Sequence, residues 1–489
     1  MRKLGVYLFF ILTTAGLFLR VYKTESIPFS DWDEGIYAQV AKEILQNRSL
    51  DTTFNDAVWL NKPPLSHLLI AASFKLFGFS EIASRAVFAF FGVLTLALLY
   101  LLSKKILAAF FTIKSSHLAL LPPLILASTP IFLERSTTLN TDIIIATSYL
   151  GYFLYKDNLL KKTLFLLLGV WSKSLVGFFP LFIEPLLWLQ KKINFKTLTK
   201  KILTLIFQII LASLWYFYAF AKHGQYFIKA HFLDQIFKRV AAPIELHFGN
   251  KWYYFKLLWE NLNWISIILA LALLAVLFDF AKLLLKKKFA SVKDKRFVLF
   301  SILLSPLAFF ALLTIGKSKI YWYLLFILPL FLLSFPYLFA KLPKNYRFFA
   351  VLPILLFSFF QFTKQTYLFK PNIKIGNKIK LAKCINKTRA QSLAFLVNED
   401  ERKIRNVLEA AQLQTETSFI YGGSPSFVFY ANKKKLTYFY KIENFLRKFR
   451  EYEIIALSQK DIPLIKGTLS DYNRICSFGE WEALEKKNL

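Results

Sequence analysis

The stretch ILTLIFQIILASLWYFYAF, from Ile202 to Phe220, decides the fold class of this chain. Like a second run from Phe297 to Ile315, it approaches the roughly 20 apolar residues that a helix needs to cross a bilayer core. Hydrophobic residues make up 56% of the chain, and Phe alone occurs 54 times. Ordinary soluble domains contain roughly 45–50% apolar residues. Because a soluble core cannot absorb so many apolar runs, the sequence predicts a polytopic α-helical membrane protein.

The chain is strongly basic, with a formal net charge of +33. A nucleic-acid-binding protein would carry its cations on one long basic face. Here the Lys and Arg side chains stand in short clusters between apolar runs. Clusters of this kind determine membrane topology and face anionic headgroups. We therefore expect membrane lipids, and no nucleic acid, as partners.

Apolar runs and basic clusters together predict the topology. Met1-Arg2-Lys3 and the apolar stretch to Leu19 resemble a signal peptide, but no small-residue cleavage site precedes Arg20. We expect an uncleaved first span that starts in the cytoplasm of a multi-pass plasma-membrane protein. Basic clusters at 191–201 and 286–296 mark cytoplasmic loops, and the path of about 11–13 membrane helices ends outside the cytoplasm. About eleven can be delimited, at residues 4–22, 86–103, 118–134, 142–155, two short segments within 164–189, 202–220, 261–283, 297–315, 321–340 and 348–363.

The apolar run 164–189 is interrupted by Lys173. Each half is too short for a full crossing, so we interpret the run as two short segments that meet outside at this lysine. An ionisable side chain inside an apolar run is costly in lipid and is therefore a candidate functional residue.

The first outside loop, about residues 23–85, contains the sequence Ser30-Asp-Trp-Asp-Glu-Gly-Ile-Tyr37. An amphipathic stretch from about 34 to 46 follows, and a second begins at Pro63-Pro64. Both are expected to be helices that lie in the membrane interface without crossing it.

The C-terminal segment, residues 365–489, differs in composition from the rest of the chain. It is charged, and short β-type runs alternate in it with helical patches. We expect a small extracytoplasmic α/β domain here and a transmembrane module over residues 1–364. The predicted strands include Ser418–Tyr421 and Glu453–Ala456, and the predicted helices include Glu401–Ala411 and Ile442–Tyr452.

The two cysteines, Cys384 and Cys476, both fall in this C-terminal segment and have no metal-type spacing. An extracytoplasmic compartment would permit a disulfide between them. The sequence leaves open whether they are paired.

Asp33 and Glu34 allow two interpretations. An Asp before an amphipathic helix is a common N-cap. It can equally be a general base that takes a proton from an attacking hydroxyl or amine.

Several basic side chains also allow both a structural and a functional interpretation. Lys62 can snorkel above an interfacial helix, or it can bind an anion beside the helix N-terminus that Pro64 predicts. Arg135 and Asp142 can form an ion pair across an outside turn. Lys319 can anchor the chain in the interface or reach an outside phosphate. The loop 221–258 gathers polar and aromatic side chains, namely His231, Asp234, Arg239, His247 and Trp252–Tyr254.

Taken in order, these positions resemble the GT-C membrane glycosyltransferases of the aminoarabinose transferase and protein O-mannosyltransferase-like superfamily. The resemblance runs from the first span to about residue 340, and it depends on the order and spacing of the segments. The matching segments are Asp33-Glu34-x-x-Tyr37-Ala38-x-x-Ala41, Lys62-Pro63-Pro64-Leu65, Ser84-Arg85-Ala86, Arg135 with Asp142, Gly169-x-x-x-Lys173, and Lys319-x-Tyr321-x-Tyr323 with Pro329.

The resemblance implies a GT-C fold and transfer of a sugar from a polyprenyl-phosphate donor to a lipid, glycan or protein acceptor on the extracytoplasmic face. It implies that Asp33, with Glu34 beside it, is catalytic and that the reaction inverts the anomeric carbon. Cations near the leaving phosphate would stabilise the charge that develops there, and no nucleotide is signalled. The residues implied at the donor phosphate are Lys62, Lys173, Arg135 and Lys319. The residues implied elsewhere in the cavity are Tyr37, Asp142, His231, Arg239 and Tyr323.

One position departs from the family pattern. The aminoarabinose transferases carry an acidic residue, associated with a metal, just before Lys-Pro-Pro, and here that position is Asn61. A neutral amide is a poor substitute for a metal carboxylate. We therefore predict neither a metal nor another cofactor.

Two other classes of function are compatible with a polytopic membrane protein. A transporter or flippase of lipid-linked sugars would use Lys173 to line a pathway, but the inverted repeat common in transporters is not visible. A non-catalytic scaffold that presents the C-terminal domain gives no reason for Asp33, Lys62 and Lys173 to share one side of the membrane.

Overall fold

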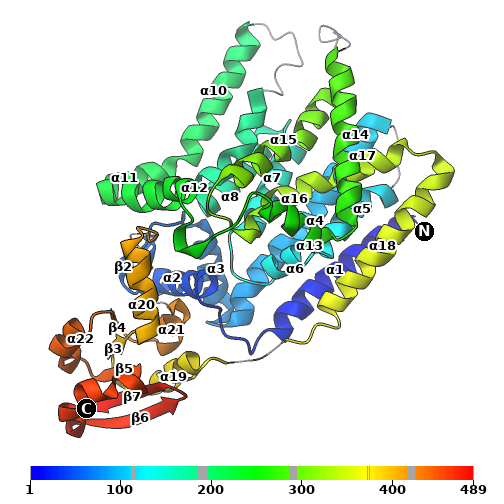
Figure 1. Ribbon diagram of the computed structural model, residues 1–489. Helices are drawn as coiled ribbons and strands as arrows, with labels where there is room; N and C mark the ends of the chain where they lie inside the picture. The colour runs from blue at the N-terminus through cyan, green and yellow to red at the C-terminus, as the bar shows by residue number, and fades with distance from the viewer. Residues whose placement is uncertain are drawn as a thin grey trace. The chain divides into compact units, whose positions relative to one another are not determined.

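The computed structural model describes residues 2–111, 116–185, 195–285, 295–371, 373, 375–415 and 424–487 (Figure 1). The chain divides into two compact units, each made of three segments. The first contains Met1–Lys23, Arg85–Gln225 and His247–Lys370, and the second contains Thr24–Ser84, Tyr226–Leu246 and Pro371–Leu489. The C-terminal segment therefore belongs to the same unit as the first outside loop.

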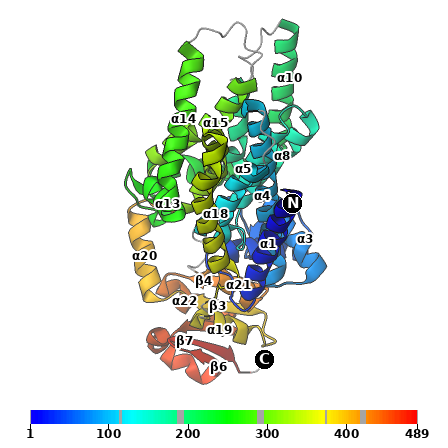
Figure 2. The same cartoon turned by 90° about the vertical axis from the view of Figure 1, so that its right-hand side faces the viewer.

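The first unit is helical. In the two views, α1 and α18 run side by side (Figures 1 and 2), and Arg20 at the end of α1 donates a 2.5 Å hydrogen bond to the carbonyl of Gln365. The helices are α1 (Arg2–Lys23), nearly all of α4 (Glu81–Phe111), α5 (Ser116–Ala127), α6 (Pro130–Arg135), α7 (Asp142–Leu154), α8 (Leu159–Lys173), α10 (Phe195–Ala212), nearly all of α11 (Leu214–Phe227), α13 (Tyr253–Leu262), α14 (Ile265–Leu285), α15 (Lys295–Ile315), α16 (Leu324–Leu332), α17 (Ser334–Lys341) and α18 (Lys344–Thr366), with the 3₁₀ segments η1 (Ser174–Ile183) and η5 (Tyr321–Tyr323).

Six of the described helical segments are long and apolar enough to cross a membrane. A seventh arises if α10 and the bent segment that follows it form one span. Three further predicted spans correspond to shorter apolar helices, His117–Ala127, Asp142–Leu154 and Phe300–Ile315. These helices confirm the predicted polytopic membrane fold. Parts of the predicted cytoplasmic clusters, residues 186–194 and 286–294, lie outside the described residues.

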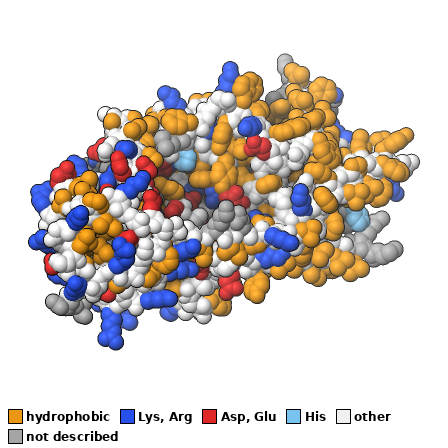
Figure 3. Space-filling model, turned by 60° about the horizontal axis from the view of Figure 1, so that its bottom comes forward, with side chains coloured by type: hydrophobic (Ala, Val, Ile, Leu, Met, Phe, Trp, Pro, Cys, Tyr) orange, Lys and Arg blue, Asp and Glu red, His pale blue; other side chains and the backbone are white. Residues whose placement is uncertain are grey.

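The outer faces of these helices are apolar. On α14, exposed side chains recur at three- and four-residue spacing: Ile267, Leu271, Leu274 and Phe278 are each 55–61% exposed. Such a stripe would be an aggregation liability in water and is expected on a helix that faces lipid. Figure 3 shows hydrophobic side chains over the helical part of one face and many charged side chains over the C-terminal sheet domain.

The segment Leu159–Ile183 satisfies the length and composition of one span, but its backbone turns back on itself. Ser174 has φ 64°, and η1 packs against α8. In a continuous helix, residues eight apart would be separated by about 12 Å. Here the Cβ position built on Gly169 lies 3.4 Å from the Cα of Gly177. The chain therefore forms a hairpin whose turn directly follows Lys173, as the interrupted apolar run predicts.

The second unit combines short helices with a five-stranded sheet. The amphipathic stretches predicted after Asp33 and Pro64 are helices α2 (Asp33–Asn47) and α3 (Leu65–Phe77). The remaining elements are β1 (Thr53–Phe54), β2 (Ala57–Val58), the π-helical η2 (Ile228–Phe237), α12 (Lys238–Ala241), η3 (Ile244–Leu246), α19 (Asn377–Ile385), β3 (Ser392–Leu396), α20 (Glu399–Ala410), α21 (Pro425–Ala431), β4 (Lys435–Phe439), α22 (Ile442–Lys448), η7 (Phe449–Glu451), β5 (Ile454–Ser458), η8 (Gln459–Asp471), β6 (Tyr472–Phe478) and β7 (Trp481–Lys486).

The sheet has the strand order β4-β3-β5-β7-β6. Strand β3 is parallel to both β4 and β5, whereas β7 is antiparallel to β5 and β6. Alternate residues such as Leu396 and Ile455 face a core that also contains Phe445 and Phe449. This sheet with its helices confirms the predicted α/β domain.

The predicted elements of this domain can be compared one by one. Strand β5 and helices α20 and α22 lie where the sequence predicts them, whereas Ser418–Tyr421 lies outside the described residues. Cys384 of α19 and Cys476 of β6 form a disulfide, with their Cα atoms 6.5 Å apart.

Candidate active site

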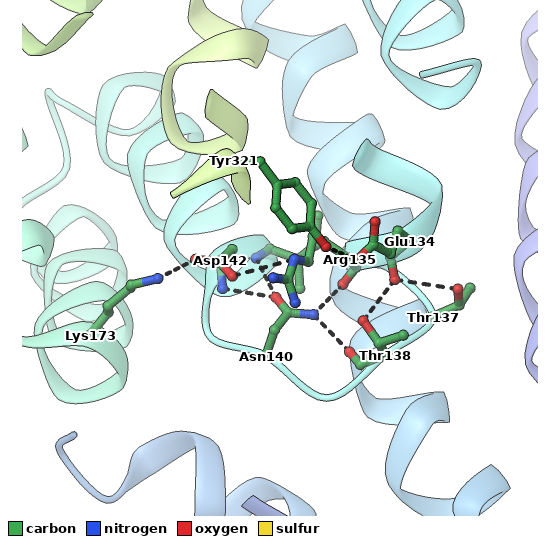
Figure 4. Close-up of polar contacts among 9 residues, drawn as sticks. Glu134, Arg135, Thr137, Thr138, Asn140, Asp142, Lys173 and Tyr321 are labelled. Carbon is green, nitrogen blue, oxygen red and sulfur yellow. Dashed lines mark hydrogen bonds and ion pairs between the residues drawn. The ribbon is translucent and has the colours of Figure 1, made fainter. Parts of the chain in front are cut away.

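Three buried charges meet in the first unit (Figure 4). Lys173, the last residue of α8, forms an ion pair with Asp142, the first residue of α7. Arg135, at the end of α6, places its Nε 3.8 Å from the second carboxylate oxygen of Asp142. The exposed fractions are 1% for Asp142, 5% for Arg135 and 7% for Lys173. Both cations are thus paired with the same carboxylate, and a second acid of this network, Glu134, accepts a hydrogen bond from the Tyr321 hydroxyl.

Asn140 fixes the loop that joins α6 to α7. Its Nδ2 donates to the carbonyls of Arg135 (2.6 Å) and Thr138 (2.7 Å), and its Oδ1 accepts from the backbone N–H groups of Asp142 (2.9 Å) and Ile143 (3.2 Å). The buried amide therefore holds both charged residues of this loop. Our sequence interpretation missed Asn140, although an Asn just before a helix start is a recognisable signal of capping.

Aromatic rings cover the two cations. The guanidinium of Arg135 lies 4.2 Å from the ring centre of Trp322 and 5.3 Å from that of Tyr321. Lys173 Nζ lies 4.8 Å from the ring centre of Tyr323. Such rings stabilise desolvated cations. The Tyr-Trp-Tyr segment of η5 thus lines the charged cluster.

Lys319, which the resemblance assigns to the donor phosphate, makes other contacts. Its Nζ donates to the carbonyls of Leu313 (3.0 Å), Thr314 (2.6 Å) and Gly316 (2.5 Å). These bonds satisfy carbonyls that would otherwise be unpaired at the end of α15. Its backbone N–H donates a 2.9 Å hydrogen bond to the backbone carbonyl of His247.

In the second unit, the adjacent acids Asp33 and Glu34 differ in burial. Glu34 is 3% exposed, and its Oε2 accepts hydrogen bonds from Ser30 N (3.0 Å) and Ser30 Oγ (3.1 Å). Asp33 is half-buried. The N-cap position of α2 is Trp32, without a side-chain cap, so the interpretation of Asp33 as a capping side chain is wrong. Glu34 thus bonds back to the turn and is buried, whereas Asp33 retains more exposed surface.

Trp32 adopts an unusual backbone conformation directly before Asp33. Its φ of 69° and ψ of −117° lie in a region that residues with a Cβ rarely adopt. Such a conformation costs about 1–3 kcal/mol and persists only where neighbouring contacts enforce it. The turn that presents Asp33 is therefore held by its surroundings.

Lys62 lies just before α3, which begins at Leu65 with Pro64 at its N-cap. Its Nζ donates to Gln235 Oε1 (3.2 Å), and His231 Nδ1 lies 2.8 Å from the carbonyl oxygen of Leu60. The segment Ile228–Phe237 thus packs beside the Lys62 turn.

The remaining predicted cavity residues have structural contacts of their own. Tyr37 is 3% exposed and packs edge-on against Trp59 and His67. Arg239 forms a 2.7 Å ion pair with Glu245. Among the described residues, no group of three or more His, Cys, Asp or Glu side chains is placed to hold a metal ion.

Comparison with known proteins agrees with this architecture. Residues 61–218 match the family described as dolichyl-phosphate-mannose-protein mannosyltransferase. A protein of Aquifex aeolicus (strain VF5) described as uncharacterized is 28% identical over 229 residues, and the match spans 43% of either chain.

Two solved structures share the fold. ArnT from Cupriavidus metallidurans in the apo state matches with a TM-score of 0.70 at 12% identity, covering 99% of this chain and 98% of that one. The same enzyme bound to undecaprenyl phosphate matches with a TM-score of 0.67 at 13% identity and the same coverage. At this identity, the match establishes the fold alone. The family match and the shared fold together confirm the predicted resemblance of this chain to the GT-C superfamily of the aminoarabinose transferases and protein O-mannosyltransferases.

Proposed function

We propose that this protein is a membrane glycosyltransferase that moves a sugar from a polyprenyl-phosphate-linked donor to an acceptor on the extracytoplasmic face of the plasma membrane. The observation that carries the proposal is the fold match to ArnT over 99% of the chain, since the second matching structure of that enzyme holds undecaprenyl phosphate. The family match over residues 61–218 supports the same reaction class.

In the proposed reaction, Asp33 is the general base. A hydroxyl or amine of the acceptor attacks the anomeric carbon, its proton passes to the Asp33 carboxylate, and the bond to the phosphate oxygen breaks. This direct displacement inverts the anomeric centre. The half-buried Asp33 is more accessible to an acceptor than Glu34, which is 3% exposed.

The leaving group is a lipid phosphate, so cations are needed where its charge develops. Lys62 is a candidate, because its ammonium group lies beside the start of α3, where it donates hydrogen bonds to the carbonyl of Asn61 and to Gln235 Oε1. Lys173 and Arg135 are candidates in the first unit, where Asp142 and the aromatic rings of η5 hold the two buried cations. Lys319 is the weakest candidate, because its ammonium group caps α15.

The test is donor turnover by the purified full-length protein in lipid nanodiscs. The protein is incubated with a panel of polyprenyl-phosphate sugars and a mixture of lipid, glycan and peptide acceptors, and released polyprenyl phosphate is measured. We expect release with at least one donor. We expect Asp33→Asn to lower turnover by at least 100-fold while donor affinity changes little.

The matched control is Asp56→Asn. Asp56 is an exposed acid of the same loop, and its φ of 62° is one that Asn adopts readily. This variant should turn over like the wild type. Release of phosphate by Asp33→Asn at the wild-type rate would remove Asp33 as the base. Transbilayer movement of an intact labelled donor, without release of polyprenyl phosphate, would instead identify a flippase.

A further inference from the structure

The C-terminal domain contacts the turn that carries Asp33. Helix α21 of this domain is buried along its whole length, and it packs against both α2 and α19. All of these elements belong to the second unit. The contacts fall on residues that come before and after Asp33 in the chain.

On the N-terminal side of Asp33, the contact is made by Asp31. Its Oδ1 accepts hydrogen bonds from the backbone N (3.2 Å) and from the hydroxyl of Ser426, a residue that is 1% exposed. Slightly earlier in the chain, the backbone N–H of Phe29 donates a 2.8 Å hydrogen bond to the hydroxyl of Tyr430. Two residues of α21 thus hold the chain as it approaches the turn.

On the C-terminal side of Asp33, the contact is made by Gly35. A Cβ at this position would lie 2.6 Å from the backbone N of Ser426, so α2 and α21 touch through their backbones. About two helical turns beyond Gly35, Lys42 Nζ donates a 3.1 Å hydrogen bond to the carbonyl of Phe429. The same short helix therefore fixes the chain on both sides of Asp33.

Between these two fixed points lies Trp32, whose positive φ is not its preferred conformation. The Asp31–Ser426 contact acts on the residue directly before Trp32, so its loss would let the backbone shift at the position from which the Asp33 side chain is directed. We propose that Ser426 and Asp31 are positioning residues through which the C-terminal domain aims the Asp33 carboxylate. This inference rests on the proposed function, because it assigns the domain a role in that reaction.

Ser426→Ala removes one of the two hydrogen bonds to Asp31 and keeps the backbone contact. We expect kcat for release of polyprenyl phosphate to fall about tenfold or more, with KM for the donor within about twofold of wild type. Ser426→Thr retains the hydroxyl and should restore most of kcat. A merely structural role would instead lower the amount of folded protein and leave kcat per folded molecule and KM unchanged.

Asp31→Ala serves as the second variant if Ser426→Ala folds poorly, because Asp31 is an exposed residue and Ala removes the oxygen that accepts both hydrogen bonds. It should lower kcat in the same way while the thermal unfolding midpoint stays close to that of wild type. The matched control is Ser477→Ala, which removes an exposed hydroxyl from β6 of the same domain.

The outcomes separate the two hypotheses. Absence of any turnover by the wild type with all donors contradicts the proposed glycosyltransferase. If the wild type turns over and the folded Ser426→Ala and Asp31→Ala variants both keep the wild-type kcat, the positioning role alone is overturned. A fall in kcat in both variants, with rescue by Ser426→Thr, supports it.

Discussion

Lys162 and Glu184 are separated by 22 positions in the sequence, and their side chains are paired at 2.8 Å in the folded chain. Tyr152 of α7 donates a further 2.6 Å hydrogen bond to the same carboxylate oxygen of Glu184. Both charged side chains are largely buried, with 11% and 9% of their surfaces exposed. The pair closes the hairpin of α8 and η1 at the end away from Lys173.

This relationship predicts an asymmetry between single and double substitutions. Glu184→Gln leaves the buried Lys162 without its counter-charge and should destabilise the protein by about 3–5 kcal/mol. Replacing both residues by Met should cost much less, because no charge is left buried. Thermal unfolding in detergent compares the variants, with Asp157→Asn as the control, since Asp157 is in an exposed pair with Lys156. If the single and double variants lost the same stability, a close interaction between Lys162 and Glu184 would be contradicted.

The hairpin also depends on Gly177. A Cβ at this position would lie 2.3 Å from the backbone N of Val170, and a backbone neighbour cannot yield as a side chain can. We expect Gly177→Ala to cost about 3 kcal/mol, the upper end for overpacked sites. Gly376→Ala is the control, because none of the described residues places a neighbouring atom within 4 Å of the corresponding Cβ position. Similar unfolding midpoints for the two variants would argue against the close contact of η1 and α8.

Lys173 and Lys319 should respond differently to removal of their charge. If Lys173 contributes to the donor-phosphate site, Lys173→Met should weaken binding of polyprenyl phosphate about tenfold, or about 1.4 kcal/mol. Lys319→Met removes the cap of α15 and should lower the unfolding midpoint with little change in affinity. Titration of both variants in nanodiscs with polyprenyl phosphate, alongside thermal unfolding, tests this division. Loss of affinity only in Lys319→Met would reverse the two assignments.

The pKa of Lys42 predicts how the stability of the protein changes with pH. Burial lowers the pKa of Lys42 from 10.5 to about 8, although the neighbouring Glu43 opposes this shift. Between pH 8 and 10.5 the unfolded chain therefore binds more protons at this site than the folded chain, so the contribution of Lys42 to stability rises with pH. The rise is at most about 3 kcal/mol. Lys42→Met should remove it.

The measurement is the difference in unfolding midpoint between the wild type and Lys42→Met at several pH values from 7.5 to 10. As the pH rises, the unfolding midpoint of the wild type should increase relative to that of Lys42→Met. A constant difference would show that Lys42 keeps its ordinary pKa in the folded protein.

Several features of the site were predictable from local sequence. Asp33 lies in the loop that follows the first apolar span, and Lys173 interrupts an apolar run, so the sequence alone marks both as candidate functional residues. The hairpin was predictable for the same reason, because neither half of the run is long enough to cross a bilayer. The contacts that distinguish Asp33 from Glu34 were not predictable, since both are acids at adjacent positions.

The sequence by itself determined the membrane fold, the order of its apolar segments and the α/β character of the C-terminal domain. These properties follow from composition and short-range periodicity, which each segment carries independently of the others. Only the tertiary structure decided which partners the charged residues have. Asp31 and Ser426 are 395 positions apart, and Asp142 and Lys173 are 31 apart. Such pairs form because packing of whole helices brings them together, and no local pattern records that packing.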